Sequence, residues 1–190
     1  MSRARSHLLA GLLLAGVVSL AQAGWIHAKA VAAQWLLQGA WTRVQEGSEG
    51  ARPWPWADTS PVAELRVPRL ERSLLVLAAA SGRTLAFGPA HVAGSAALGS
   101  VGNAVLTGHR DTHFDFLRHL RSGDRIEIRN ADGEGATYRV FSMTVVHQED
   151  LEIPTDAARP ELTLVTCFPF DAVTSGGPWR YVVRAEAPLT

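Results

Sequence analysis

From residue 60 onward, the sequence is a succession of short strand-forming runs that are separated by turn signals. These runs are VAELRVPRL, SLLVLAA, NAVLTGHR, DRIEIRN, TYRVFSMTVVH, ELTLVTC and RYVVRAEA. Asp132-Gly133, between the fourth and fifth runs, is a strong hairpin signal. Only Phe114–Gly123 looks helical, and it stops at a glycine. Closely spaced strands with turn signals predict an all-β fold, a closed or nearly closed barrel of about eight strands.

A long uncharged run near the N-terminus determines the compartment. The chain begins with the basic stretch MSRARSH, and the first charged residue after Arg5 is Lys29, with histidine counted as neutral. Such a run can span the hydrocarbon core of a bilayer, which is about 30 Å thick. The basic start keeps the N-terminus in the cytoplasm and sends the rest across. We therefore predict a retained transmembrane anchor. The alternative is a signal peptide cleaved after Ala21-Gln22-Ala23, and both export the domain.

The sequence predicts three parts. Residues 1–28 form a signal-anchor, residues 29–59 a membrane-proximal helix and linker, and residues 60–190 the β-barrel. The helix carries tryptophans that suit either a membrane surface or packing against the barrel. Gln45–Ser60 is rich in glycine, proline and small polar residues, which is typical of a linker.

The composition excludes several functions. The chain has 18 basic and 18 acidic residues among 190, so it lacks the basic footprint of a nucleic-acid-binding protein. Its single cysteine, Cys167, excludes an intramolecular disulfide and a zinc site of several cysteines. Cys167 is then a buried apolar residue, a reactive nucleophile or one half of an intermolecular bridge. Free cysteine is usually buried, so the nucleophile requires further residues to support it.

A histidine is what would activate this thiol, because the thiolate is the nucleophile. His109 follows a strand and a glycine in LTGHRDTHF, so a rigid sheet can aim it into a cleft. His113, four residues on, is expected to be a solvated loop residue. The pair is a weak metal signal without a third ligand. We assign no metal ligand and no cofactor.

Two arginines on the last strand are candidates to stabilise an oxyanion. Arg180 and Arg184 are four residues apart, so in a strand they point to the same face. If the Cys167 strand pairs antiparallel with this one, Arg180 comes near the thiol, and Arg184 lies about 13 Å further along. A forked, permanently charged guanidinium suits a developing carbonyl anion. Taken singly, either arginine would be interpreted as part of a surface ion pair.

The stretches TGHRDTHF, TLVTC and RYVVRAE, in this order, resemble a sortase, most closely the proteobacterial sortases sometimes called class GN. The resemblance covers about residues 60–187. It implies an eight-stranded sortase-like barrel with short helices, preceded by an N-terminal transmembrane helix. The catalytic cysteine, histidine and arginine of the family fall on Cys167, His109 and Arg180. The Pro- and Gly-rich loop CFPFDAVTSGGPW departs from the Gram-positive members.

The resemblance also implies a function. We expect a cysteine transpeptidase of the inner membrane, single-pass, with its catalytic domain facing the periplasm. Its substrate would be a protein with an LPxTG-like C-terminal sorting signal, and its second substrate an amine acceptor. Two alternatives remain: an exported hydrolase in which water resolves the thioester on the same triad, and a non-catalytic barrel that binds peptide termini.

Overall fold

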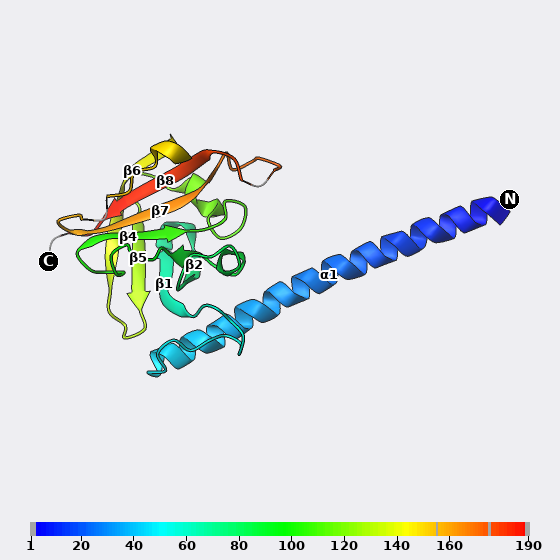
Figure 1. Cartoon of the computed structure of the whole chain (residues 1–190), viewed down its shortest axis with the longest axis horizontal. Helices are drawn as coiled ribbons and strands as arrows, with labels where there is room; N and C mark the ends of the chain where they lie inside the picture. Colours follow the sequence, from blue (N-terminus) through cyan, green and yellow to red (C-terminus); the bar gives the residue numbers. More distant parts are fainter. Residues whose placement is uncertain (1–2, 155, 175, 189–190) are drawn as a thin grey trace. The chain divides into compact units, whose positions relative to one another are not determined.

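The computed structural model describes residues 3–154, 156–174 and 176–188. It separates into two compact units, one up to Leu36 and one from Leu37 onward, which we call the helical unit and the barrel unit. Figure 1 shows the chain coloured from its N-terminus to its C-terminus.

The helical unit belongs to a single long helix, α1, which spans Arg3–Gln45. Its large apolar side chains between Leu8 and Leu36, among them Trp25 and Trp35, are exposed. By length and composition, residues 7–45 are able to cross a membrane, and this is the one such helix in the described residues. The predicted N-terminal apolar helix is therefore present and continues without interruption into the segment that carries Trp41.

The barrel unit contains eight strands in a closed barrel, in the order β1-β2-β3-β4-β7-β8-β6-β5 (Figure 1). The strands are β1 (Pro61–Val67), β2 (Arg72–Leu77), β3 (Ala90–His91), β4 (Gly102–Thr107), β5 (Arg125–Asn130), β6 (Gly135–His147), β7 (Pro160–Phe168) and β8 (Trp179–Glu186). Short 3-10 helices η1 (Pro68–Leu70), η2 (Thr84–Ala86), η3 (Asp115–His119) and η4 (Gln148–Asp150) connect them.

The predicted all-β barrel is confirmed. The seven strand-forming runs correspond to seven of its strands. The strand β3 was not predicted, because two residues are too few to show alternation. The helix predicted at Phe114–Gly123 is shorter, since η3 covers only Asp115–His119 and a strand-like Leu120 ends it.

Inward-facing residues fill the barrel with a continuous apolar core. Alternate positions of every long strand contribute to it, as period-two strands require, and Phe114, Phe116 and Leu117 close it near η3. On β7 the inward residues are Leu162 and Leu164. Consequently Thr163, Val165 and Cys167 belong to the outer face of that strand.

The last turns of α1 belong to the barrel unit. Leu37 and Trp41 form a second apolar cluster with Leu75, Leu77 and Ala90 of β2 and β3. Residues 46–60, which the sequence predicts to be a linker, pack on the same unit. Within this segment Ala57 and Thr59 are buried, and the Thr59 hydroxyl donates to the carbonyl oxygen of Ala78 at 2.7 Å.

Two tryptophans on α1 allow a matched test of this packing. Trp41 is 5% exposed and Trp35 is 75% exposed. Trp41→Ala should lower the free energy of unfolding by about 3–5 kcal/mol, because it opens a cavity between helix and barrel. Trp35→Ala should change it by less than about 0.5 kcal/mol. Urea unfolding of the full chain in detergent, followed by circular dichroism, measures both values. Equal effects of the two substitutions would contradict the assignment of Trp41 to the core.

Candidate active site

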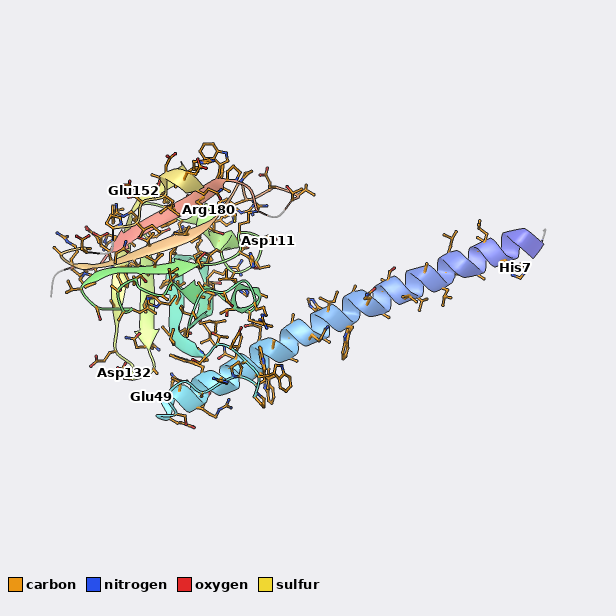
Figure 2. All side chains as sticks on the ribbon, viewed as in Figure 1. His7, Glu49, Asp111, Asp132, Glu152 and Arg180 are labelled. Carbon is orange, nitrogen blue, oxygen red and sulfur yellow. The ribbon has the colours of Figure 1, made fainter. Side chains whose placement is uncertain are left out.

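Cys167 lies near the end of β7, a strand that is hydrogen-bonded to a neighbouring strand on each side. β7 pairs parallel with β4 and antiparallel with β8. In the β7–β8 register, Cys167 lies directly opposite Arg180. Opposed residues of antiparallel strands have Cα atoms about 4.5–5.5 Å apart and direct their side chains to the same face. Figure 2 shows Arg180 on β8, well apart from Asp132 in the β5–β6 hairpin.

His109 follows the end of β4, which is the neighbour of β7 on the side away from β8. The last pair of the β4–β7 ladder joins Thr107 to Val165. Gly108 extends the contact, because its amide donates to the Val165 carbonyl at 3.3 Å and its carbonyl accepts from the Thr166 hydroxyl at 2.7 Å. His109 is the next residue and is exposed. Carried two residues past its last pair, the β4–β7 register would bring His109 opposite Cys167.

Close packing explains why the residue before His109 is a glycine. A Cβ atom at Gly108 would lie 2.9 Å from the buried ring of Phe114. Real Cβ atoms do not approach a ring this closely, so the close packing of the chain on Phe114 requires glycine. The Phe114 amide also donates to the carbonyl oxygen of His109 at 2.9 Å. The backbone of His109 is thus fixed on both sides while its ring stays accessible.

Arg180 is held by its own turn and by a residue from η4. Its Nη1 donates to the carbonyls of Gly177 and Trp179, at 2.7 and 3.0 Å, and its Nη2 donates to Oε1 of Gln148 at 2.8 Å. The Gln148 amide donates in turn to the Pro178 carbonyl at 2.7 Å. These contacts orient the guanidinium of an arginine that stays partly open to solvent. No sequence signal pointed to Gln148.

Arg184 occupies a different environment. It pairs with Thr163 in the ladder, four residues from Arg180. Its Nη2 donates to Glu161 at 2.8 Å, and its guanidinium lies 5.3 Å from the ring centre of Phe141. Its charge is already paired on the barrel surface. Only Arg180, of the two candidates, lies at the level of the thiol.

Neither of two other nearby histidines matches the position of His109. His147 pairs with Trp179, and its ring packs edge-on against that side chain with centres 5.3 Å apart. Since Trp179 and Arg180 alternate along β8, His147 belongs to the opposite face of the sheet from Cys167. His113 lies in the loop after β4.

We expected His113 to be solvated, but it is half-buried. Burial lowers the pKa of its ring, and the charge of His109 lowers it further, although a hydrogen bond with the backbone of Ala86 acts in the opposite direction. The ring is therefore neutral at neutral pH. This position favours packing against η2 over proton transfer.

Two buried polar side chains, one at the far end of β4 and one beside His109, were not predicted. Asn103 on β4 donates to the Pro154 carbonyl at 2.8 Å and accepts from the Thr163 hydroxyl at 2.9 Å, so it ties the β6–β7 connection to the outer face. Arg110, directly after His109, is also buried. Its place next to a histidine that faces outward was an available signal, since successive residues of an extended chain point to opposite sides.

The described residues contain no group of three or more histidine, cysteine or acidic side chains arranged to hold a metal ion. This end of the barrel carries a thiol, an imidazole and a guanidinium, on three consecutive strands or their extensions. A thiol beside an imidazole can act as a nucleophile, and a guanidinium beside both can bind an oxyanion.

Comparison with known proteins identifies relatives of this arrangement. The sortase domain model matches residues 65–188. Sortase D of Bacillus subtilis (strain 168) is 32% identical over 123 residues, which cover 64% of this chain and 61% of that protein. The match therefore spans about three-fifths of the relative's length.

Solved structures with the same fold include two that are 30% identical to this chain. Sortase A from Corynebacterium diphtheriae superposes with a TM-score of 0.60, covering 71% of this chain and 64% of that one. Sortase C-1 from Actinomyces oris superposes with a TM-score of 0.57, covering 70% and 77%. In both cases the similarity extends over most of the barrel unit.

Proposed function

Because this chain belongs to the sortase family, we propose that it is a cysteine transpeptidase that cleaves a protein at a C-terminal sorting signal and joins the product to an amine. The observation that carries the proposal is the register of three strands. Cys167 pairs with Arg180 in the β7–β8 ladder, and the β4–β7 ladder ends two residues before both His109 and Cys167, which supports a shared site. The domains assigned from the sequence, residues 1–28, 29–59 and 60–190, remain part of this proposal.

In the first half of the reaction, Sγ of Cys167 attacks the carbonyl carbon of the scissile peptide bond. The carbonyl oxygen takes up negative charge in the tetrahedral intermediate. When the C–N bond breaks, the imidazolium of His109 protonates the departing amine. The product is a thioester between the sorting signal and Cys167.

In the second half, an amine nitrogen attacks the thioester carbon. The neutral imidazole of His109 accepts the proton that this nitrogen loses. The C–S bond breaks, and Cys167 leaves as the thiolate while the new amide forms. His109 therefore acts as acid and then as base, which requires access to solvent and substrate, and its exposed ring provides that access.

Arg180 stabilises the oxyanion or orients the substrate backbone. Its guanidinium is held by Gln148 and by two carbonyls of its own turn, and its backbone pairs with Cys167 in the β7–β8 ladder. A planar cation held in place before the reaction is most effective where charge develops, because it does not have to reorganise. Arg184, which is paired with Glu161, has no such role.

Cys167→Ala should abolish turnover and formation of the thioester while the barrel stays folded, because the change removes the nucleophile and little volume. His109→Ala should reduce turnover nearly as much, and His113→Ala should reduce it far less. Mass spectrometry of the intact protein after incubation with a peptide library detects the acyl-enzyme. Cleavage by Cys167→Ala at a tenth of the parent rate or more would refute the mechanism.

The same assay separates transfer from hydrolysis. Products are compared with and without an added amine at equal peptide concentration. A transpeptidase gives an amide product whose yield rises with amine, whereas a hydrolase gives the free acid in both cases. Equal sensitivity to His109→Ala and His113→Ala would point instead to a shared metal site, which a chelator would test.

Arg180→Lys should not restore activity although it keeps the charge, because lysine lacks the planar fork. Loss of one oxyanion donor costs about 10²–10³-fold in turnover in other enzymes, and we expect a loss in that range. Arg184→Lys is the matched control on the same strand and should change turnover only slightly. Turnover of the cognate peptide measures both, and a greater loss at Arg184 would show that the roles are reversed.

The substrate class follows from the family. We assign an LPxTG-like signal, with an amine as acceptor, and we place the chain in class GN on the stretches TGHRDTHF, TLVTC and RYVVRAE. A sequence tree of sortase domains tests the class, and grouping with Gram-positive classes would contradict it. The peptide library tests the signal directly.

The proposed location is the outer face of the cytoplasmic membrane, with the barrel unit in the periplasm. The long apolar helix and the basic residues before it support this orientation. A substrate held in the same membrane would meet the site at a raised effective concentration. The single cysteine has no intramolecular partner for a disulfide in an oxidising compartment, so it stays available.

Full-length protein should therefore pellet with membranes and resist high-salt and carbonate washes, since an apolar helix of this length inserts stably. Protease should degrade the barrel unit only from the periplasmic side. Fractionation followed by N-terminal sequencing provides the measurement. A soluble species that starts at Gly24 would refute the anchor and leave the catalytic proposal intact.

A further inference from the structure

Arg110 differs from its neighbour His109 in its exposure to solvent. His109 is exposed, whereas Arg110 is 5% exposed and is the only arginine among the buried described residues. The ion pairs in the described part of the chain do not include it. A buried guanidinium remains charged, so its charge must be balanced by hydrogen-bond acceptors.

Those acceptors all come from one segment. Nη1 of Arg110 donates to the carbonyl of Gly176 at 3.2 Å, and Nη2 donates to the carbonyls of Ala172 at 3.3 Å and of Thr174. These carbonyls belong to the connection between β7 and β8, which we call the β7–β8 segment (residues 169–174 and 176–178). The segment begins two residues after Cys167 and ends two residues before Arg180.

The two ends of the β7–β8 segment are held without Arg110, because Phe170 packs against the core and the Gly177 carbonyl accepts from Arg180 at 2.7 Å, but its middle has fewer contacts. Its described part contains one internal backbone hydrogen bond, from Ala172 to Pro169 at 3.4 Å. Val173, at its centre, is 101% exposed, so no apolar burial fixes that part. Arg118 donates to the Phe170 carbonyl at a longer 3.4 Å and is itself exposed. For the middle of the segment, the strongest polar contacts among the described residues are the three charge-assisted bonds from the buried fork of Arg110.

We propose that Arg110 is a positioning residue that fixes the β7–β8 segment to the backbone of His109. Its three bonds join the connection between the Cys167 and Arg180 strands to the chain that carries the histidine. We call these three bonds the Arg110 clamp. Its effect on catalysis rests on the proposed function, but the clamp itself is a property of the fold. It also explains why a buried charge follows an exposed histidine.

Arg110 does not take the place of Arg180 in this scheme. The carbonyls of the β7–β8 segment already occupy both of its terminal nitrogens, and its side chain is removed from solvent. Arg180 lies opposite the thiol and is partly open. Arg110 therefore acts through the segment and through His109, and it does not touch the substrate.

The test uses the full chain in detergent and two variants, Arg110→Lys and Arg69→Lys. Lysine keeps the charge but supplies a single point of donation, so it cannot bond three carbonyls in a fork. Arg69 is the matched control, because it too is held by forked bonds, to the Asp124 carboxylate and the His119 carbonyl at 2.6 Å, elsewhere on the barrel. Three quantities are measured: cleavage of the native fold by proteinase K, alkylation of Cys167 by iodoacetamide, and peptide turnover.

Arg110→Lys should be cut by proteinase K between Pro169 and Pro178 at least tenfold faster than the parent, as mapped by mass spectrometry. Its kcat/KM for the peptide should fall at least tenfold, because small displacements at a site cost up to about 10²-fold. The rate at which iodoacetamide alkylates Cys167 should stay within threefold of the parent rate, which would show that the thiol keeps its surroundings. Arg69→Lys should leave proteolysis of this segment and kcat/KM within twofold of the parent.

The outcomes distinguish the clamp from its rivals. Parental protection and parental turnover in Arg110→Lys would overturn the proposal. Lost turnover with an unchanged cleavage pattern would also overturn it, because Arg110 would then act on the substrate directly. The proteolysis measurement needs no substrate, so it judges the clamp even if the protein proves not to be a transpeptidase.

If Arg110→Lys does not fold, the segment itself provides the test. Deleting Val173 and Thr174 removes one acceptor and changes the spacing of the other two, and the exposure of Val173 makes folding of this variant expected. The deletion should reproduce the faster proteolysis and the loss of turnover. Parental values of both would overturn the clamp.

Discussion

The double pairing of β7 is the constraint on which the site depends. β7 is hydrogen-bonded to β4 on one side and to β8 on the other, and its inward residues pack in the core. A slip of one residue in either ladder would turn the apolar face of a strand outward, so the core fixes the register. The register in turn fixes which residues lie beside Cys167. The positions of His109 and Arg180 are therefore consequences of core packing, long before any substrate is bound.

Strands alone do not complete the site, because the side chains that meet there come from strand ends and connections. The connections are fixed by polar side chains: Asn103 bonds the β6–β7 connection, Gln148 bonds Arg180, and Arg110 bonds the β7–β8 segment. A buried polar group that is fully bonded specifies one arrangement, since any other leaves it unsatisfied at a cost of about 1–3 kcal/mol. The apolar core thus sets the register, and buried polar groups set the connections.

This division explains what the sequence could predict. Seven strands were visible as alternating runs because each signal is local, and β3 was not because two residues carry no period. Cys167, His109 and Arg180 were identifiable by residue type and by position at strand ends. Gln148 and Asn103 were not, because their partners lie 32 and 51 residues away and nothing local marks them. The solvated position expected for His113 was wrong for the same reason, since η2 covers it from a distant part of the chain.

The N-terminal helix shows the same limit at the level of domains. Composition changes near residue 45, where the helix gives way to a segment rich in glycine and proline. Packing changes earlier, because the large apolar side chains up to Leu36 are exposed while Leu37 and Trp41 are buried against β2 and β3. Apolar residues serve equally well in a bilayer and in a protein core, so hydropathy cannot tell the two surroundings apart. The end of the catalytic unit is therefore defined by which side chains its strands cover.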